Sequence, residues 1–413
     1  MCRVAIVGVS CTPRNKEYMR YTDSKSWKDY VIEGAYGAIK DVQKGMNPRD
    51  LQYAVVNYHG EASVEAGGIG PVVADILGLH PMGVTALCAN CTGAGVSMHD
   101  AYGMVASGMY KRVLALGFDK RYDLLNFGDK RAIGGDVDYD FNLGYDHPGL
   151  QGLLQAYAYQ RWGRKKVLMA MAAYRIQSNW WANRNPLAGG YGVPAKATFK
   201  DLCDILDNAD EKKDVPEEFW AKLPGNFPTE GSSAVIMVPA DDAYAYTDKP
   251  IFIDAITYST NSHLLSKQMY YNAPGLSEYD MCDFASTHIA AKKAYEMADM
   301  TVDDIDFAQV FESHITSLIP TLAATQVTDM DHVLDFIIEG GTGYDGRMPT
   351  GTDGGRGGFG FTSGSNFTDG VFESVIQMRG EAGERQLKKT DASIVIGMQG
   401  EMASSTVAIL RKE

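Results

Sequence analysis

Short apolar runs alternate along this chain with segments in which apolar residues recur at helical spacing. The stretch 26–42 has apolar residues three and four positions apart, which predicts an amphipathic helix. Short apolar runs bounded by turn-forming residues predict buried strands at 3–9, 51–58, 111–118, 232–238, 251–257 and 391–398. Strands that alternate with helices in this way favour an α/β fold containing parallel strands.

One long segment breaks this alternation. Residues 120–230 are rich in Gly, Pro, Trp and Tyr, and they contain one convincing helical pattern, at 167–185. Long segments inserted into a regular α/β scheme usually form lids or binding loops. We therefore expect a loop insertion at about 120–230.

Two parts of the sequence resemble each other. "MNPRDLQYAVV" starts at residue 46 and "MTVDDIDFAQV" starts at residue 300, with similar residues in the same order at a constant offset of 254. A helical pattern precedes each copy. Further on, "CTGAGVSMHDAYGMVASG" precedes one predicted strand, and "TSGSNFTDGVFESVIQMRG" precedes another. Two repeats in the same order predict a duplicated α/β half, with one half at 1–245 and the other at 246–413.

The duplication predicts where a binding site would lie. Ligands of open α/β layers bind beyond the carboxyl ends of the strands. His59 and His314 follow such strand ends, whereas Cys91 and the turn 362–364 precede predicted helices. We expect these four features to lie close together.

Composition narrows the class of protein. The chain has 413 residues, of which 45% are hydrophobic and 22% are charged, as in soluble globular proteins. Its net charge of −14 argues against nucleic acid and against an anionic membrane surface as partners. No apolar run reaches the ~18–20 residues of a membrane span. Six scattered cysteines without an export signal predict reduced thiols and a cytoplasmic location.

Cys88 and Cys91 form a CxxC pair, for which several roles are open. A zinc site needs two more ligands, and the sequence has neither a second CxxC nor an HxxxH, so we expect no metal. A redox pair or two buried structural cysteines remain alternatives. A nucleophile at Cys91 is favoured, because the N-terminus of a helix lowers a thiol pKa. Backbone amides from Gly93 onward would then stabilise an oxyanion on an acyl group.

Histidines supply the candidate proton acceptors, since histidine titrates near neutral pH. His59 and His314 follow strand ends, and His147 starts a predicted helix inside the insertion. Glu312 is a further candidate acid, although an exposed polar residue is the simpler interpretation. The glycine-rich stretch 351–366 lacks the GKS or GKT ending of a phosphate-binding loop, so we expect its backbone to pass close to a bound ligand.

At these motifs the chain resembles the thiolase superfamily, in particular the sterol-carrier-protein-type branch. The resemblance covers essentially the whole chain, and it is carried by "ADILGLHPMGVTALCANCTGAG", "RNPLA", "DIDFAQVFESH" and "GMQGEMASSTVAIL". It implies two pseudo-twofold-related βαβαβ halves in an α/β/α/β/α arrangement. It also implies Cys91 as the nucleophile, coenzyme A as co-substrate without a covalently bound cofactor, and a homodimeric core.

The sequence departs from the family at two polar positions. Gly360-Phe361-Thr362 stands where the family has Gly-His-Pro, and Phe311 stands where it has Asn or His. Either catalysis has been lost, or His59, His147 and His314 take over. We expect the substrate to contact Phe361, Phe311, Gly93 and Gly360.

Such an aromatic lining favours an aryl-substituted 3-oxoacyl-CoA. Together with this lining, the resemblance implies as the expected reaction the thiolytic cleavage of 2-benzoylsuccinyl-CoA to benzoyl-CoA and succinyl-CoA, a step of anaerobic toluene degradation. The alternatives are an acyltransferase of the phloroglucinol type and a non-catalytic binding or scaffold subunit. Relatives in this branch often work with a small zinc-ribbon/OB-fold subunit, which the resemblance therefore implies as a partner.

Overall fold

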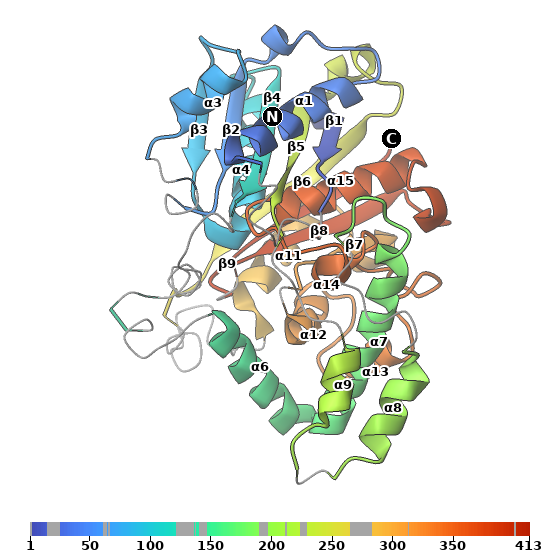
Figure 1. The fold of residues 1–413 in the computed structure, drawn as a ribbon. Helices are drawn as coiled ribbons and strands as arrows, with labels where there is room; N and C mark the ends of the chain where they lie inside the picture. Colours follow the sequence, from blue (N-terminus) through green and yellow to red (C-terminus); the bar gives the residue numbers. More distant parts are fainter. Residues whose placement is uncertain are drawn as a thin grey trace.

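The computed structural model describes residues 2–14, 25–60, 64, 67–120, 136, 138–139, 147–189, 197–210, 213–223, 229–264, 283–312, 314–399 and 402–413. Within these residues the strands form one nine-stranded sheet in the order β3-β2-β4-β5-β1-β6-β9-β8-β7 (Figure 1). The strands of its first part are β1 (Val4–Cys11), β2 (Tyr53–Asn57), β3 (Gly83–Leu87), β4 (Val113–Asp119) and β5 (Gly231–Pro239). Those of its second part are β6 (Ile251–Thr260), β7 (Phe307–Gln309), β8 (Ala392–Met398) and β9 (Ser404–Arg411).

The same strand arrangement occurs twice in this sheet. Read outward from the antiparallel β1–β6 junction, one side runs β1, β5, β4, β2, β3 and the other runs β6, β9, β8, β7. Directions agree as well, because β2 and β4 are parallel like β7 and β8, whereas β5 and β9 are antiparallel to both neighbours. Among the described residues, only the first side has an additional edge strand, β3.

The repeated sequences adopt the same local structure. Residues 46–56 form the 3₁₀ helix η2 (Pro48–Asp50) and then β2, and residues 300–310 form η7 (Val302–Asp304) and then β7. A helix precedes each copy, namely α1 (Trp27–Asp41) and α11 (Ala285–Ala298). The second repeat forms α4 (Gly93–Ala106) before β4 and α15 (Asn366–Arg379) before β8. The duplication predicted from the sequence is therefore present in the fold.

Helices cover this twisted sheet in three layers. α1 packs on β1, β4 and β5, and α11 packs on β6 and β9. Between the two parts of the sheet lie α4 and α15, and each of them contacts strands from both parts. The expected α/β/α/β/α order is thus confirmed, with the two β layers continuous through β1 and β6.

Local chemistry explains why these elements form where the pattern predicts them. Ser26 and Asp29 make a reciprocal capping box at the start of α1, and the helix buries Tyr30, Val31 and Ala35 on one face. Every residue of β4 and β8 is buried, because helices cover both faces of these strands. Such strands appear in the sequence as continuous apolar runs.

The insertion contains more helix than its sequence indicated. The helix predicted at 167–185 is α7 (Arg164–Ala182), and it is joined by α6 (His147–Trp162), α8 (Phe199–Asp207) and α9 (Glu217–Lys222). These four helices lie at the end of the molecule away from α3 (Gly70–Ile76) and β3 (Figure 1). α8 and α9 have only 9 and 6 residues, which is too short for a helical period to stand out, although α8 is amphipathic and begins with a capping box of Thr198 and Asp201.

The remaining helices are α12 (Ile315–Ala324), α13 (Val333–Ile338) and α14 (Gly355–Gly358), with 3₁₀ turns η3 (Asn90–Thr92), η5 (Ala240–Ala245) and η8 (Gly383–Arg385). In the part of the chain that the structure describes, no helix has both the length and the apolar character that a bilayer crossing requires.

Candidate active site

Cys91 lies in the short turn η3, between the edge strand β3 and the helix α4. The backbone of Asn90, the residue before it, has a φ of 50°, a left-handed conformation that is uncommon for a residue other than glycine. Such conformations concentrate at functional sites. Because α4 begins two residues after Cys91, the thiol is placed at the positive end of a 14-residue helix.

Two glycines allow the start of α4 to approach neighbouring strands. A Cβ on Gly93 would overlap the side-chain amide of Asn57, at the end of β2. A Cβ on Gly95 would come within 2.6 Å of Thr406 in β9. The hydroxyls of Thr92 and Thr406 are 3.2 Å apart. The first turn of α4 is therefore fixed against both parts of the sheet.

Asn57 connects the predicted features of the two halves. Its Nδ2 donates to the carbonyl of Gly364 at 2.8 Å, and its Oδ1 accepts from the backbone N–H of Ala89 at 3.4 Å. The turn 362–364 is thereby held next to the Cys91 elbow, as the duplication predicted. The sequence pattern did not single out Asn57, although this residue lies near the end of a predicted strand, two residues before His59.

An apolar cluster borders Cys91. The rings of Phe311 and Phe361 lie 5.7 Å apart in an edge-to-face arrangement, and both belong to this cluster. Its other buried members are Leu150, Leu154, Phe284, Ala324, Met398 and Met402, and the half-buried Cys91 and Tyr157 pack against it. The structure thus brings the predicted nucleophile together with the two aromatic residues that replace polar ones.

The helix α6 from the insertion covers this cluster. Leu150 and Leu154 reach it from one face of α6, while Leu153 is 49% exposed on another. His147 is the first residue of α6, as the sequence predicted, but its side chain is outside the described part of the structure. The proposed role of His147 therefore stays a prediction.

The other two predicted histidines are half-buried, with His59 two residues after β2 and His314 directly before α12. His314 is the N-cap of α12, where its Nδ1 is 2.8 Å from the hydroxyl of Thr316. His59 follows β2, and a Cβ on the adjacent Gly60 would lie 3.7 Å from the sulfur of the exposed Cys88. His314 thus has a capping role in the structure, and catalytic roles for both histidines stay predictions.

Gly360 begins the Gly-Phe-Thr sequence with a φ of 129°. A Cβ at this position would meet the side chains of Thr229, at 2.8 Å, and Arg14, at 3.3 Å. The carbonyl of Phe361 accepts from the N–H of Thr229 at 2.8 Å, and the hydroxyls of Thr229 and Thr362 are 2.7 Å apart. These contacts fix the backbone that carries Phe361.

Buried ion pairs lie next to the turn that carries Phe361. The guanidinium of Arg14 donates to Asp369 at 2.6 Å, and Arg356 pairs with Asp369 at 3.3 Å and with Asp353. All four side chains are at most 3% exposed. Because Arg14 follows β1 and Asp369 lies in α15, this network joins the two parts of the fold.

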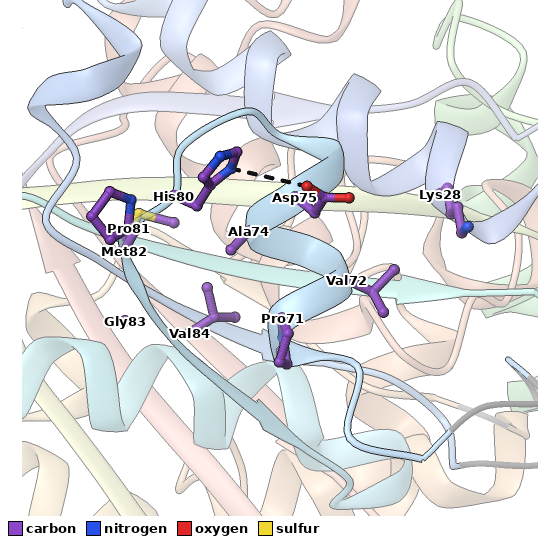
Figure 2. A pocket seen from close by; sticks show the side chains of 11 residues that line it. Lys28, Pro71, Val72, Ala74, Asp75, His80, Pro81, Met82, Gly83 and Val84 are labelled. Carbon is purple, nitrogen blue, oxygen red and sulfur yellow. Dashed lines mark ion pairs between the residues drawn. The ribbon is translucent and has the colours of Figure 1, made fainter.

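A separate surface pocket lies between α3 and β3. Figure 2 shows His80, Asp75, Pro71 and Val84 among its lining side chains, with His80 Nδ1 4.0 Å from Asp75 Oδ1. It contains none of the predicted site residues, and both members of this ion pair are exposed. Among the described residues, no group of three or more His, Cys, Asp or Glu side chains could hold a metal ion.

Comparisons with known proteins agree with this geometry. Residues 272–412 match the family model described as thiolase C-terminal domain-like. The acetyl-CoA acetyltransferase of Methanothermobacter thermautotrophicus is 26% identical over 410 residues, which is 99% of each chain.

Solved structures show the same fold over the full chain. The Ltp2-ChsH2(DUF35) aldolase superposes with a TM-score of 0.77 at 18% identity, covering 99% of this chain and 98% of that one. Human mitochondrial 3-ketoacyl-CoA thiolase superposes with a TM-score of 0.67 at 12% identity, covering 100% and 99%. The chain therefore has the fold of the thiolases, and the matches of residues 272–412 to the thiolase C-terminal model and of the full chain to an acetyl-CoA acetyltransferase support a thiolase-type acyltransferase.

Proposed function

We propose that this enzyme cleaves an aryl-substituted 3-oxoacyl-CoA through an acyl-enzyme on Cys91. The thiolate of Cys91 attacks the ketone carbonyl, and the bond between that carbonyl and the neighbouring α-carbon breaks. The aryl acyl group stays on the sulfur as a thioester, and the released acyl-CoA takes a proton at its α-carbon. The thiol of coenzyme A then attacks the thioester and removes the acyl group. The acyl-enzyme thus divides one difficult reaction into two easier steps.

The placement of Cys91 is the observation that supports this proposal. Cys91 lies in η3, two residues before the first residue of α4. A helix N-terminus favours a thiolate, and its free backbone N–H groups can stabilise an oxyanion. We propose that the amides from Gly93 onward serve this purpose. His59, His147 and His314 are the proposed proton carriers.

The aromatic cluster supports an aryl acyl group. Phe311 and Phe361 present an edge-to-face pair beside the thiol, and aromatic pairs accept a further ring in the same geometry. 2-Benzoylsuccinyl-CoA is the proposed substrate, with benzoyl-CoA and succinyl-CoA as products.

The acyl-enzyme provides the first test. Wild-type protein incubated with 2-benzoylsuccinyl-CoA, without free coenzyme A, should gain the mass of one benzoyl group on the peptide that carries Cys91. Cys91→Ala should abolish this adduct and lower thiolysis at least about 1,000-fold, because the covalent step is lost. Cys88→Ala is the matched control and should keep the adduct.

An unchanged adduct on Cys91→Ala would contradict the assignment of the nucleophile. Acetoacetyl-CoA supplied in the same assay separates the two classes of acyl group. A clear preference for acetoacetyl-CoA would contradict the proposed aryl substrate. It would instead indicate an acyltransferase without specificity for aryl groups.

A second candidate is a carbon–carbon lyase that forms no acyl-enzyme. The apolar surroundings of Cys91 favour it, as does the similarity of the fold to a protein described as an aldolase. A lyase would release an aldehyde or ketone without free coenzyme A, and Cys91→Ala would retain activity. Product analysis by mass spectrometry therefore distinguishes the two reactions.

We also propose an assembly with two kinds of contact. β3 is an edge strand whose outer backbone groups have no strand partner in the described sheet, so a second copy of the chain can pair there to give a homodimer. The name of the Ltp2-ChsH2(DUF35) aldolase joins two components, which supports a second protein subunit, and we propose that this subunit is the small zinc-ribbon/OB-fold protein that the sequence resemblance implies. Light scattering of the purified chain, alone and after co-purification from its source, tests both contacts.

A further inference from the structure

Glu312 is a buried carboxyl group that the proposed reaction does not use. It lies just after β7 and is 0% exposed, although its sequence context suggested an exposed residue. Its Oε1 accepts the backbone N–H of Arg356 in the first turn of α14. A Cβ on Gly355 would overlap the same oxygen, and Gly355 has a φ of 62°. The glycine here is what lets the backbone close around the carboxyl group.

α7 presses on the same stretch of backbone, which we call the glycine-rich segment (residues 351–361). The hydroxyl of Tyr174 lies 2.8 Å and 2.9 Å from the positions that Cβ atoms on Gly351 and Gly355 would take. The guanidinium of Arg175 lies directly against Gly357. Because these glycines have no side chains, α7 packs directly against the backbone of the glycine-rich segment.

Two side-chain nitrogens at this contact have no hydrogen-bond partner among the described residues. They are Nε and Nη1 of Arg175, whereas the hydroxyl of Tyr174 makes a side-chain hydrogen bond with Glu312. All three side chains are at most 3% exposed. Unpaired buried polar atoms are costly, so this contact is sensitive to the charge of its members.

The contact connects to the proposed acyl site at two points. Phe311 immediately precedes Glu312, and the glycine-rich segment ends at Phe361. The two rings touch each other and border Cys91. A change in how tightly the segment packs on α7 would therefore move Phe361 relative to the thiol.

We propose that Glu312 is a positioning residue whose proton keeps the glycine-rich segment packed on α7 and Phe361 packed beside Cys91. Loss of that proton loosens the segment and opens the apolar cluster to a substrate. The effect on substrate entry rests on the proposed function. The anchor, by which we mean the packing of the glycine-rich segment on α7 through protonated Glu312, does not.

The direction of the pH dependence follows from the groups that face Glu312. Tyr174 and Arg175 face it from α7, and Asp353 and Arg356 face it from the loop before α14 and from α14 itself. Burial has the largest effect on the pKa of Glu312 and raises it, Arg356 and Arg175 lower it, Asp353 raises it, and together they place it at about 6. A carboxyl whose pKa is raised by packing holds its proton more tightly in the packed state. Opening is therefore favoured as the pH rises through about 6.

Hydrogen exchange measured by mass spectrometry tests the anchor without any substrate. Protection factors of peptides covering the glycine-rich segment, corrected for intrinsic exchange, should fall between pH 5 and pH 8 in the wild type. The fall over this range can reach about eightfold, because a pKa raised from 4.5 to about 6 changes the opening equilibrium about 30-fold in all and part of that change is already complete at pH 5.

Glu312→Gln is the decisive variant, because glutamine resembles the protonated carboxyl in shape and charge. Its segment should stay as protected at pH 8 as the wild type is at pH 5. Glu339→Gln, at an exposed position after α13, is the matched control and should follow the wild type. A wild-type segment with pH-independent protection, or a Glu312→Gln variant that loses protection like the wild type, would overturn the proposal.

Arg175→Met provides a second measurement that does not depend on the folding of Glu312→Gln. Arg175 lowers the pKa of Glu312, so its removal should move the midpoint of the exchange transition to higher pH. An unchanged midpoint would contradict the proposed contact.

Kinetics then connect the anchor to the reaction. In the wild type, KM for the acyl-CoA should fall as the pH rises through about 6. In Glu312→Gln this change of KM with pH should be absent, while kcat at high pH should stay close to that of the wild type. A change of KM with pH that persists in Glu312→Gln would contradict the effect on substrate entry. Absence of any acyl transfer would count against the proposed function alone, because the exchange experiment decides the anchor independently.

Discussion

The side chain of Asn57 shows how one buried amide positions the proposed nucleophile. It contacts the residues on both sides of Cys91, through Ala89 and Gly93, and it donates to Gly364 from the other part of the fold. A buried amide with several partners specifies one geometry, because leaving any partner unpaired is costly.

Gly93→Ala should therefore destabilise the protein and displace the thiol. The added Cβ overlaps Asn57, and overpacking of this kind costs about 1–3 kcal/mol. We expect the free energy of unfolding in urea to fall by that amount and alkylation of Cys91 by iodoacetamide to slow about tenfold or more.

Gly103→Ala is the matched control in the same helix, because a Cβ there meets nothing within 4 Å. It should leave alkylation unchanged and stabilise α4 by about 0.5–1 kcal/mol, as alanine does in helices. Equal effects of the two substitutions would show that Asn57 does not determine the geometry of the elbow.

The insertion contributes to the proposed site through the helix α6. Its buried face contributes Leu150 and Leu154 to the apolar cluster, while other residues of the helix stay exposed. α6 packs on α7 and α12, and these two helices hold it in position. An inserted helix, and not the repeated α/β scaffold, thus closes one side of the cluster around Cys91.

Leu154→Ala should enlarge this side of the cluster. Leu154 is 2% exposed, and removing a buried leucine side chain costs about 2–5 kcal/mol. We expect lower stability together with a shift of kcat/KM toward bulkier acyl groups, measured with a series of acyl-CoA thioesters.

Leu153→Ala changes the neighbouring residue, which is 49% exposed, and should alter neither property. If both variants kept the wild-type acyl preference, α6 would not line the acyl site.

The molecule as a whole is built from two similar parts that share a middle layer. α4 contacts β6 and β9 of the second part, and α15 contacts β1 and β5 of the first. The Arg14–Asp369 ion pair joins the same two parts at a place with no exposure to solvent. Neither part can bury its middle helix without the other.

The proposed halves, residues 1–245 and 246–413, should accordingly not fold alone. Each expressed separately should give little cooperative unfolding by circular dichroism and should expose apolar surface that binds a hydrophobic dye. Co-expression of both should restore a folded complex, as two chains that share a core assemble together. A cooperatively folded fragment 1–245 would contradict this view of the middle layer.

Strand and helix positions were predictable to the extent that neighbouring residues determine them. The runs at 3–9, 111–118 and 391–398 became β1, β4 and β8 because strands covered on both faces carry uninterrupted apolar residues. The short helices α8 and α9 escaped prediction, since with 9 and 6 residues they are too short for a helical period to stand out.

By itself, the sequence determined the alternating α/β elements, their duplication, and the position of Cys91 before a helix. The elements and the position of Cys91 follow from residue spacing within short windows, and the duplication follows from comparing such windows 254 residues apart. Only the tertiary structure decided that Glu312 is buried and that Asn57 meets Gly364, and only it placed Phe311, Phe361 and Cys91 around one cluster. Burial and pairing depend on segments hundreds of residues apart, and residue types alone do not show which distant segments pack together.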